Sequence, residues 1–355
     1  MEAGSQGYRV GVVGATGAVG STILEVLAER EFPIAELVPF ASERSAGKKV
    51  ELAGSKVACR TLSGETIGGL DLVLSSAGGA VSSEWAPRLV EAGAVVIDNT
   101  SYWRMHDEVP LVIPEVNPDA AGSHRGLIAN PNCTAMAMVV ALAPIQREVG
   151  IERLVVSTYQ SVSGTGRQAV DELIAQSRAV IDGKQPEALV YPHQVAFNIV
   201  PQVEAFKDGD DYTTEERKVM AETRKILGVT EDELRISATC ARVPVVTGHS
   251  ESINVQTRDP LSPEECRELL AGAPGVVVVD SPGDAVYPLA IDAAGRDEVL
   301  VGRIRRDPSH ERCLNLWVVG DNLRKGAALN AIQVAELLVE RDLVRVPEGA
   351  AALAA

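Results

Sequence analysis

The chain has 355 residues, of which 46% are hydrophobic and 23% are charged, and its formal net charge at pH 7 is −16. This length is too great for one ordinary core and predicts two domains, and the composition excludes extensive disorder. The negative charge argues against nucleic acid or an anionic membrane as a general partner, because both require a basic surface. It leaves room for an anionic ligand in a local basic pocket.

The cysteines and the start of the chain indicate a cytoplasmic protein. The five cysteines are scattered, odd in number and without a C-x-x-C pair, so the sequence predicts neither a disulfide framework nor a metal site. Residues 1–7 are polar and lack the apolar segment of a signal peptide. No apolar run approaches the roughly 20 residues that span a bilayer. A reducing compartment is the simplest inference.

The first predicted strand, Arg9 to Val13, runs into a glycine loop and then a helix over 21–30. This order is typical of a dinucleotide-binding unit, in which glycines let the backbone approach a pyrophosphate at the helix N-terminus. The loop glycines are Gly14, Gly17 and Gly20. Their spacing is G-x-x-G-x-x-G rather than the commoner G-x-G-x-x-G, so a purely structural turn is the alternative.

A second strand, Glu36 to Phe40, ends where such a domain meets the adenosine ribose of its cofactor. An acid at this point favours the ribose hydroxyls of NAD, whereas serine, arginine and lysine suit the 2′-phosphate of NADP. Ser42, Arg44 and Lys48 outnumber Glu43, so the sequence predicts NADP. A solvated charged loop is the alternative reading.

Two further apolar strands, 71–76 and 94–98, are joined by a predicted helix, which repeats the β-α-β pattern. Such strands form a parallel sheet covered on both faces, with ligands at the carboxyl ends of the strands. Ser76 and Gly78 therefore lie where a cofactor would pass. Arg104 follows the second of these strands and is a candidate anion clamp, although most exposed arginines bind nothing.

The fifth strand, Leu127 to Asn130, leads into a turn and an apolar helix over 136–142. Asn132 is a favoured N-cap, so Cys133 is expected in the first helical turn. Backbone amides and the positive end of the helix dipole stabilise a thiolate there, and the same amides could hold an oxyanion. Cys133 is therefore a candidate nucleophile. The alternative is a small core residue, the usual role of a free cysteine.

From Ile151 onward the pattern changes to longer alternating strands, as expected for a separate domain with a mostly antiparallel sheet. The predicted fold class is α/β, with a Rossmann-type parallel sheet domain over 1–132 and an α+β catalytic and dimerisation domain over 133–322. A C-terminal helix over 323–342 is expected to complete the first domain and to let Asn322 reach the nicotinamide. Residues 343–355 are low in complexity and are predicted to fray.

Three places in the second half carry candidate site residues. After the strand over 153–162, Gln160 could orient a substrate carbonyl, and Ser163 with Gly164 could contact nicotinamide. Arg242 and His249 flank one strand connection, where histidine can exchange a proton with a thiol and arginine can hold a carboxylate.

Glu215 and Lys218 lie at i, i+3 on one face of a helix that Thr213 can cap. They could bind an ammonium group and a phosphate respectively. A solvated ion pair is the alternative that the spacing alone favours.

Together these residues resemble the aspartate-β-semialdehyde dehydrogenase family over nearly the whole chain, roughly residues 8–342. No single motif would suffice. The resemblance rests on Gly14–Gly20, Ser42–Gly47, Asn130–Thr134, Gln160 with Ser163 and Gly164, Glu215 with Lys218, Arg242–Val245 with Gly248 and His249, and Gly320–Ala327.

The resemblance implies Cys133 as the nucleophile of an acyl-enzyme, His249 as the acid/base and Gln160 as the residue that orients the acyl group. Arg242 would hold the substrate α-carboxylate and Glu215 its ammonium group. Further substrate and phosphate contacts would come from Arg104, Asn132 and Lys218. The NADP-binding residues would be Gly14, Thr16, Gly17, Ala18, Val19, Ser42, Arg44, Ser45, Ser76, Gly78, Ser163, Gly164 and Asn322.

The implied reaction is the NADPH-dependent reduction of β-aspartyl phosphate to aspartate-β-semialdehyde with release of phosphate, by a homodimer. One alternative is N-acetyl-γ-glutamyl-phosphate reductase, which uses related acyl-phosphate chemistry. Arg242 together with Glu215 favours a free amino acid over an N-acetylated one. A non-catalytic NADP-binding sensor is the alternative outside the enzymes.

Overall fold

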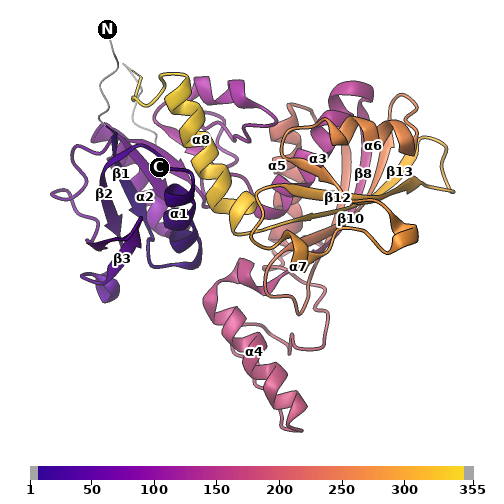
Figure 1. The fold of residues 1–355 in the computed structure, drawn as a ribbon, viewed down its shortest axis with the longest axis horizontal. Helices are drawn as coiled ribbons and strands as arrows, with labels where there is room; N and C mark the ends of the chain where they lie inside the picture. Colours follow the sequence, from indigo (N-terminus) through magenta and orange to yellow (C-terminus); the bar gives the residue numbers. More distant parts are fainter. Residues whose placement is uncertain (1–6, 348–355) are drawn as a thin grey trace. The chain divides into compact units, whose positions relative to one another are not determined.

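The computed structural model describes residues 7–347, which divide into two compact units (Figure 1). The first unit contains the chain up to Pro131 and again from Ala327 onward, and the second contains Asn132–Gly326. Among residues 7–347, no helix combines the length and the apolar character that crossing a membrane requires.

The first unit is built on five parallel strands in the order β2-β1-β5-β6-β7. Their bounds are β1 Tyr8–Val13, β2 Ile34–Phe40, β5 Leu72–Ser75, β6 Val95–Asp98 and β7 Leu127–Ala129. The strand order reverses between β1 and β5, and ligands bind beyond the carboxyl ends of the strands at such a point. The predicted parallel Rossmann-type sheet is confirmed.

Three helices cover this sheet: α1 (Ala18–Glu29), α2 (Gly79–Glu91) and α8 (Leu329–Glu340). Apolar residues of α1 and α8 share one buried cluster with residues of β1, β5 and β6. Helix α2 packs on β6 and β7. The near-continuous apolar runs of these strands are explained by burial on both faces.

The first unit departs from the sequence prediction in two places. An antiparallel hairpin of β3 (Lys49–Leu52) and β4 (Ser55–Ala58) follows β2, and its polar, exposed residues gave no strand signal. The helix predicted over 323–342 begins only at Leu329, because Arg324–Ala328 forms a wider π-helical turn. At the start of this turn, the Asp321 carboxylate accepts hydrogen bonds from the amides of residues 323 and 324.

The predicted frayed tail is only partly within the described residues. Leu343, Val344 and Val346 pack against the core of the first unit, and the Leu343 carbonyl lies 3.2 Å from Nε2 of His124. Their apolar side chains account for this ordered packing. Residues 348–355 lie outside the described part of the chain.

The second unit contains a six-stranded mixed sheet in the order β11-β12-β13-β10-β8-β9. The bounds are β8 Ile151–Gln160, β9 Arg235–Arg242, β10 His249–Thr257, β11 Val276–Val278, β12 Val299–Arg306 and β13 Cys313–Gly320. The three central pairings are antiparallel and both edge pairings are parallel. The predicted second domain with a largely antiparallel sheet is therefore confirmed.

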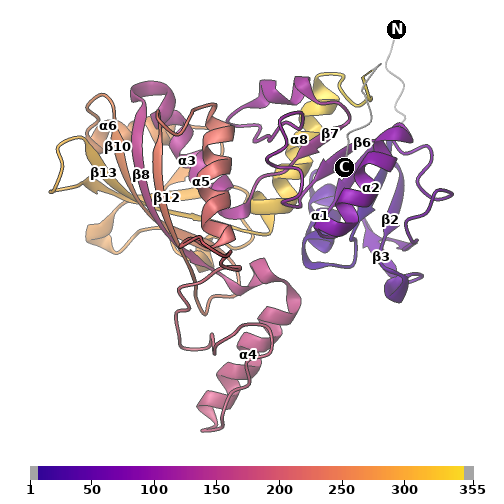
Figure 2. The ribbon, with the colours of Figure 1, turned by 180° about the vertical axis from the view of Figure 1, so that it is seen from behind.

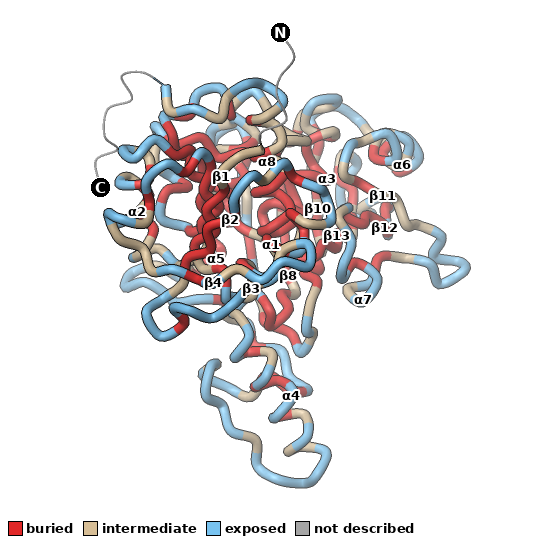
Figure 3. Tube along the Cα trace, turned by 60° about the vertical axis from the view of Figure 1, so that its left-hand side comes forward, coloured by how far each residue is buried: buried red, intermediate tan, exposed pale blue. Residues whose placement is uncertain are grey.

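Helices α3 (Cys133–Val149), α5 (Thr214–Leu227) and α6 (Pro263–Ala271) pack against this sheet, as the reverse view in Figure 2 also shows. Two more helices, α4 (Arg167–Ile181) and the short α7 (Ala290–Ala293), lie outside this layer. Figure 3 shows the central strands β8, β10, β12 and β13 of this sheet largely buried and the α4 segment largely exposed.

The side chains of β10 alternate between the two faces of the sheet, and this alternation places some of its polar residues in the interior. Residues 249, 251, 253 and 255 are buried, whereas 252, 254 and 256 are only half-buried, as the period of two in a strand requires. Ser250 of β10 pairs with Tyr159 of β8, so His249 lies level with Gln160. Gln160 in turn pairs with Arg242 of β9. Gln160, Arg242 and His249 therefore lie at the same end of the neighbouring strands β8, β9 and β10.

Candidate active site

Cys133 is the first residue of α3, and Asn132 caps this helix as predicted. The Asn132 side-chain oxygen accepts hydrogen bonds from the amides of Thr134 (2.9 Å) and Ala135 (3.2 Å). Asparagine is favoured here because its short side chain reaches these amides from an extended backbone. The thiol thus stands at the positive end of a 17-residue helix, where a thiolate is stabilised.

Cys133 differs from the other four cysteines in its exposure. It is half-buried, whereas Cys59, Cys240, Cys266 and Cys313 are buried. Burial raises the pKa of each of these four thiols, to about 12 for Cys266. Burial thus favours the protonated, less reactive form of these thiols near neutral pH, which leaves Cys133 as the candidate nucleophile.

His249 faces the thiol, with Nε2 at 3.4 Å from Sγ of Cys133. Its side chain is 1% exposed. Burial, and secondarily the charge of Arg242, lower the pKa of His249 to about 3, so the ring is neutral at physiological pH. A neutral imidazole beside a thiol can exchange a proton with it.

The other ring nitrogen of His249 contacts Ser161, a residue absent from the sequence prediction. The Ser161 amide donates to Nδ1 at 3.1 Å, and the Ser161 hydroxyl lies 3.1 Å from the same atom. The hydroxyl in turn donates to the side-chain oxygen of Asn322 at 3.0 Å. The only sequence signal for Ser161 was its position directly after Gln160 at a strand end.

Glu215 forms the centre of a second group of site residues. The residue is 3% exposed, and its carboxylate accepts hydrogen bonds from Asn132 Nδ2 (3.1 and 3.0 Å) and Gln160 Nε2 (3.1 Å). Lys218 lies 3.7 Å from it and also pairs with Glu204, so the predicted helix face carries an ion pair. Thr213 caps α5 as expected, in a capping box with Glu216.

Arg242 is a buried cation with an unused donor. It is 5% exposed, and its Nη1 donates to the Ser161 carbonyl at 2.6 Å. Its Nε has no hydrogen-bond partner. An unpaired buried N–H costs about 1–3 kcal/mol, so this donor fits a ligand with an acceptor oxygen. A Cβ added at Gly164 would lie 3.5 Å from Nη1 and 3.4 Å from the His249 ring, which places Gly164 beside both residues.

Gly326 is a further residue that sequence reasoning missed. A Cβ at this position would lie 2.9 Å from Cβ of Cys133, closer than real Cβ contacts allow. Only glycine leaves the nucleophile in its place. The sequence contained this glycine in a family motif, but its contact with Cys133 depends on the fold.

The first unit contains the predicted cofactor loop. A Cβ at Gly20 would lie 2.1 Å from the Gly14 carbonyl oxygen, so only glycine lets α1 pack this closely on the loop. Helix α1 begins at Ala18, followed by Val19, and no side chain caps it at Gly17. Its first-turn amides therefore suit a phosphate, in keeping with the predicted dinucleotide site.

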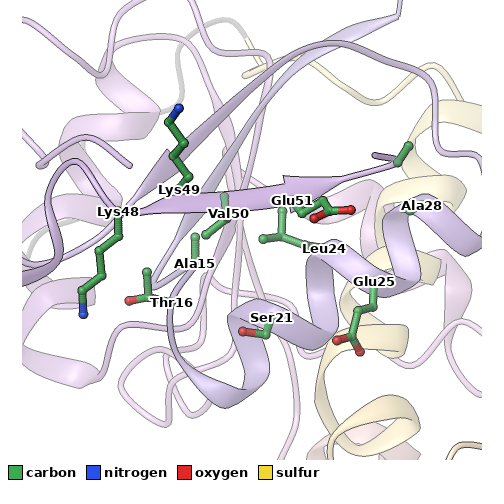
Figure 4. A pocket seen from close by; sticks show the side chains of 11 residues that line it. Ala15, Thr16, Ser21, Leu24, Glu25, Ala28, Lys48, Lys49, Val50 and Glu51 are labelled. Carbon is green, nitrogen blue, oxygen red and sulfur yellow. The ribbon is translucent and has the colours of Figure 1, made fainter. Parts of the chain in front are cut away.

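A cavity of about 580 Å³ lies between α1 and β3 (Figure 4). Lys48 and Thr16 lie at one end of its lining, and Glu25 and Glu51 lie toward the other. The predicted residues Ser42, Arg44 and Ser45 belong to the preceding 3₁₀ turn and its cap, and they are outside this lining. The cationic end fits a phosphate, so of the residues that predicted the NADP 2′-phosphate, Lys48 is the one that lines this cavity.

Arg104 is buried rather than exposed, and it holds together the carboxyl ends of two strands. Its Nε donates to the Asn130 carbonyl at 2.9 Å and its Nη2 to the Asn99 carbonyl at 2.8 Å. Ser76 lies beside the glycine loop, donating through Oγ to the Val13 carbonyl at 3.3 Å, and Gly78 precedes α2. The ligand contacts of these first-unit residues stay predictions.

Within residues 7–347, no group of three or more histidine, cysteine, aspartate or glutamate side chains could hold a metal ion. The second unit contains Cys133, His249, Arg242 and the group around Glu215. This arrangement places a thiol beside a neutral imidazole, and it adds a buried guanidinium with an unpaired donor and a buried carboxylate. The chemistry it supports is covalent acyl transfer.

Comparison with known proteins gives a family for both units. Residues 9–124 match the family model described as semialdehyde dehydrogenase, NAD binding domain, and residues 142–325 match semialdehyde dehydrogenase, dimerisation domain. The aspartate-semialdehyde dehydrogenase of Aquifex aeolicus is 53% identical over 342 residues, covering 95% of this chain and 100% of that protein. That of Synechocystis is 50% identical over 333 residues, covering 94% and 98%.

Solved structures give the same result. Aspartate semialdehyde dehydrogenase II from Vibrio cholerae has a TM-score of 0.90 at 47% identity, covering 94% of this chain and 99% of that one, and it was also solved in complex with ASA. The Candida albicans enzyme, solved with NADP, has a TM-score of 0.74 at 28% identity, covering 95% and 99%. The chain belongs to the aspartate-semialdehyde dehydrogenase family of oxidoreductases.

Proposed function

We propose that this protein catalyses the NADPH-dependent reduction of β-aspartyl phosphate to aspartate-β-semialdehyde, with release of phosphate, through a Cys133 thioester. The reverse reaction is phosphorylating oxidation of the aldehyde. This step belongs to the biosynthesis of lysine, threonine, methionine and isoleucine. The observation that carries the proposal is the 3.4 Å contact between Cys133 Sγ at a helix N-terminus and a neutral, buried His249.

Two charged side chains support a free amino acid as the substrate. The unpaired Nε of Arg242 suits the α-carboxylate, which can accept from a guanidinium in two places. The buried Glu215 carboxylate suits the ammonium group, and its bonds from Asn132 and Gln160 hold it in place. We assign the phosphate of the substrate to Lys218 and Arg104.

The proposed chemistry begins at sulfur. Cys133 gives its proton to Nε2 of His249 and attacks the acyl carbon, forming a C–S bond, while amides of the first α3 turn stabilise the oxyanion. Collapse breaks the C–O bond to phosphate and leaves the thioester, whose acyl group Gln160 orients. NADPH supplies the hydride when bound. Hydride addition leaves a thiohemiacetal oxyanion. As its C=O bond re-forms and the C–S bond breaks, His249 returns its Nε2 proton to the departing Cys133 sulfur, and the aldehyde is released.

NADP is the proposed cofactor, and the loop before α1 together with Lys48 and Thr16 supports it. The family model of this region is an NAD-binding domain, which supports a nicotinamide cofactor in general. Preference for the 2′-phosphate is proposed from Lys48, Arg44 and Ser42. Ser163, Gly164 and Asn322 are proposed to contact the nicotinamide.

We also propose that two copies associate through the second unit. The family model over residues 142–325 is a dimerisation domain. One face of the six-stranded sheet carries half-buried side chains, among them Tyr159 and Trp317, whose rings are 5.4 Å apart, and the Asn254 and Asn315 amides, 3.0 Å apart. Such a face, with aromatic rings among polar groups, suits a protein partner.

The test is reduction of NADP and of NAD by aspartate-β-semialdehyde with and without phosphate, with N-acetyl-γ-glutamyl semialdehyde as the competing substrate. Phosphate-dependent reduction of NADP by the free amino-acid aldehyde is expected. Turnover of only the N-acetylated aldehyde would refute the substrate. Cys133→Ala is expected to abolish steady-state activity, and retained activity would refute the covalent mechanism.

A further inference from the structure

Ser161 uses all its polar atoms on residues of the active site. Its amide donates to His249 Nδ1 at 3.1 Å, its hydroxyl oxygen lies 3.1 Å from the same nitrogen, and its carbonyl accepts from Arg242 Nη1 at 2.6 Å. The residue is 0% exposed. It therefore offers Nδ1 both a donor and an acceptor from a fixed position.

These two contacts belong to different forms of the neutral ring. When Nδ1 accepts from the Ser161 amide, the single ring proton must be on Nε2, where it points at the Cys133 sulfur. In that form Nε2 cannot take the thiol proton. When Nδ1 is protonated and donates to the Ser161 hydroxyl, the Nε2 lone pair faces Sγ at 3.4 Å, and the ring can act as a base.

Asn322 fixes the Ser161 hydroxyl as an acceptor for the ring. The Gly248 amide donates to Asn322 Oδ1 at 2.9 Å, which identifies that atom as the oxygen. The Ser161 hydroxyl donates its proton to the same oxygen at 3.0 Å, and Asn322 Nδ2 donates to Ser163 Oγ at 2.9 Å. With its own proton engaged, Ser161 Oγ has two lone pairs, one for Nδ1–H and one for the Ser163 hydroxyl, which lies 3.3 Å away.

We propose that Ser161 is a positioning residue that selects the reactive tautomer of His249: its hydroxyl accepts the Nδ1 proton and so keeps the Nε2 lone pair toward Cys133. The ring then takes the S–H proton at Nε2 as sulfur attacks, and it carries one proton on each nitrogen until Nε2 returns its proton to the Cys133 sulfur as the thiohemiacetal collapses. The Nδ1 proton stays on Nδ1 throughout. The catalytic part of this inference rests on the proposed function.

Two substitutions separate the hydroxyl from the backbone of Ser161. Ser161→Ala removes only Oγ and leaves the amide, which favours the Nε2–H form that cannot accept the thiol proton. Ser161→Thr keeps the hydroxyl and is expected to restore the wild-type behaviour. The matched control is Ser250→Ala, because Ser250 is 8% exposed and follows His249 in β10 but points to the opposite face of the sheet.

The first measurement is the tautomer of His249 by nitrogen-15 NMR near neutral pH, assigned by the signals lost in His249→Gln. We expect the Nδ1–H form in the wild type, in Ser161→Thr and in Ser250→Ala, and the Nε2–H form in Ser161→Ala. Iodoacetamide alkylation of Cys133 is the second measurement. Its rate should fall in Ser161→Ala, and its rise with pH should move to higher pH, because the base for the thiol proton is lost.

The third measurement is steady-state kinetics. Ser161→Ala should lower kcat by on the order of 10²-fold, the lower end of what general acid–base catalysis contributes, with KM for the aldehyde little changed. A wild-type ring found only as Nε2–H, or a Ser161→Ala enzyme with unchanged tautomer and kcat, would overturn the proposal. A kcat loss without a tautomer change would also do so. If the wild type lacks phosphate-dependent turnover, the proposed function fails, whereas NMR and alkylation still decide the role of Ser161.

Discussion

Glu251 is a carboxyl group at the centre of the second sheet, and we expect its replacement by methionine to stabilise the protein. It lies on β10 between Thr158 of β8 and Val318 of β13 and is 0% exposed. Neither carboxyl oxygen has a hydrogen-bond partner. Methionine is similar in length, flexible and apolar, so it can fill the same space without a polar group to bury.

The expected gain follows from the missing hydrogen bonds. A buried polar group without a partner costs about 1–3 kcal/mol of unfolding free energy, and Glu251→Met removes that cost. For a domain of the size of the second unit, a change of 1 kcal/mol in the free energy of unfolding corresponds to roughly 2–4 °C in Tm. The substitution should therefore raise Tm by roughly 2–12 °C, as measured by calorimetry or circular dichroism.

Glu216→Met is the matched control, because Glu216 is also a buried glutamate of the second unit but its oxygens accept from the amides of Thr213 (2.7 Å) and Cys240 (2.9 Å). Removing this carboxylate leaves two buried donors unpaired and should lower Tm. Opposite signs for the two variants are the expected result. A Glu251→Met protein less stable than the wild type would contradict the reasoning.

The pH dependence gives Glu251 a second test. Burial raises the pKa of Glu251 well above its ordinary value, so the folded state keeps a proton that the unfolded state releases above about pH 4.3. The wild type therefore loses stability from this group as the pH rises from 4 toward 7. The advantage of Glu251→Met should be smallest near pH 4 and largest near pH 7, and an advantage that shrinks with rising pH would contradict the assignment.

Three further predictions concern the position of Cys133, the binding of the aldehyde and the binding of NADP. Gly326→Ala should displace Cys133 and lower the rate of its alkylation and kcat, with Tm and KM for NADP as controls, because the added Cβ would lie 2.9 Å from that of Cys133. Arg242→Leu should raise KM for the aldehyde by roughly 10- to 100-fold, the loss of a charged hydrogen bond worth about 1.5–3 kcal/mol, and an unchanged KM would contradict its role. Lys48→Ala should raise KM for NADP, whereas KM for NAD should not rise. A parallel rise for both cofactors would refute contact with the 2′-phosphate.

Local sequence patterns determined much of the first unit and the setting of the nucleophile. Alternating apolar strands and helices with a glycine loop after β1 were enough to predict a parallel sheet, because such strands must be covered on both faces. Asn132 predicted the start of α3 at Cys133, since an N-cap acts on amides only two or three residues away. The family motifs then favoured the functional roles of His249, Arg242 and Glu215 over the structural alternatives that their own neighbours left open.

What only the tertiary structure decided depends on residues distant in the chain. Gly326 limits the space around Cys133, and Asn322 orients Ser161, which in turn contacts His249. Glu251 followed an ordinary alternating pattern, and its missing partners became visible only with the register of β8, β10 and β13. The physical reason is that caps and strand periodicity act over a few residues, whereas hydrogen-bond partners, tautomers and steric limits are set by strand pairing and packing across the fold.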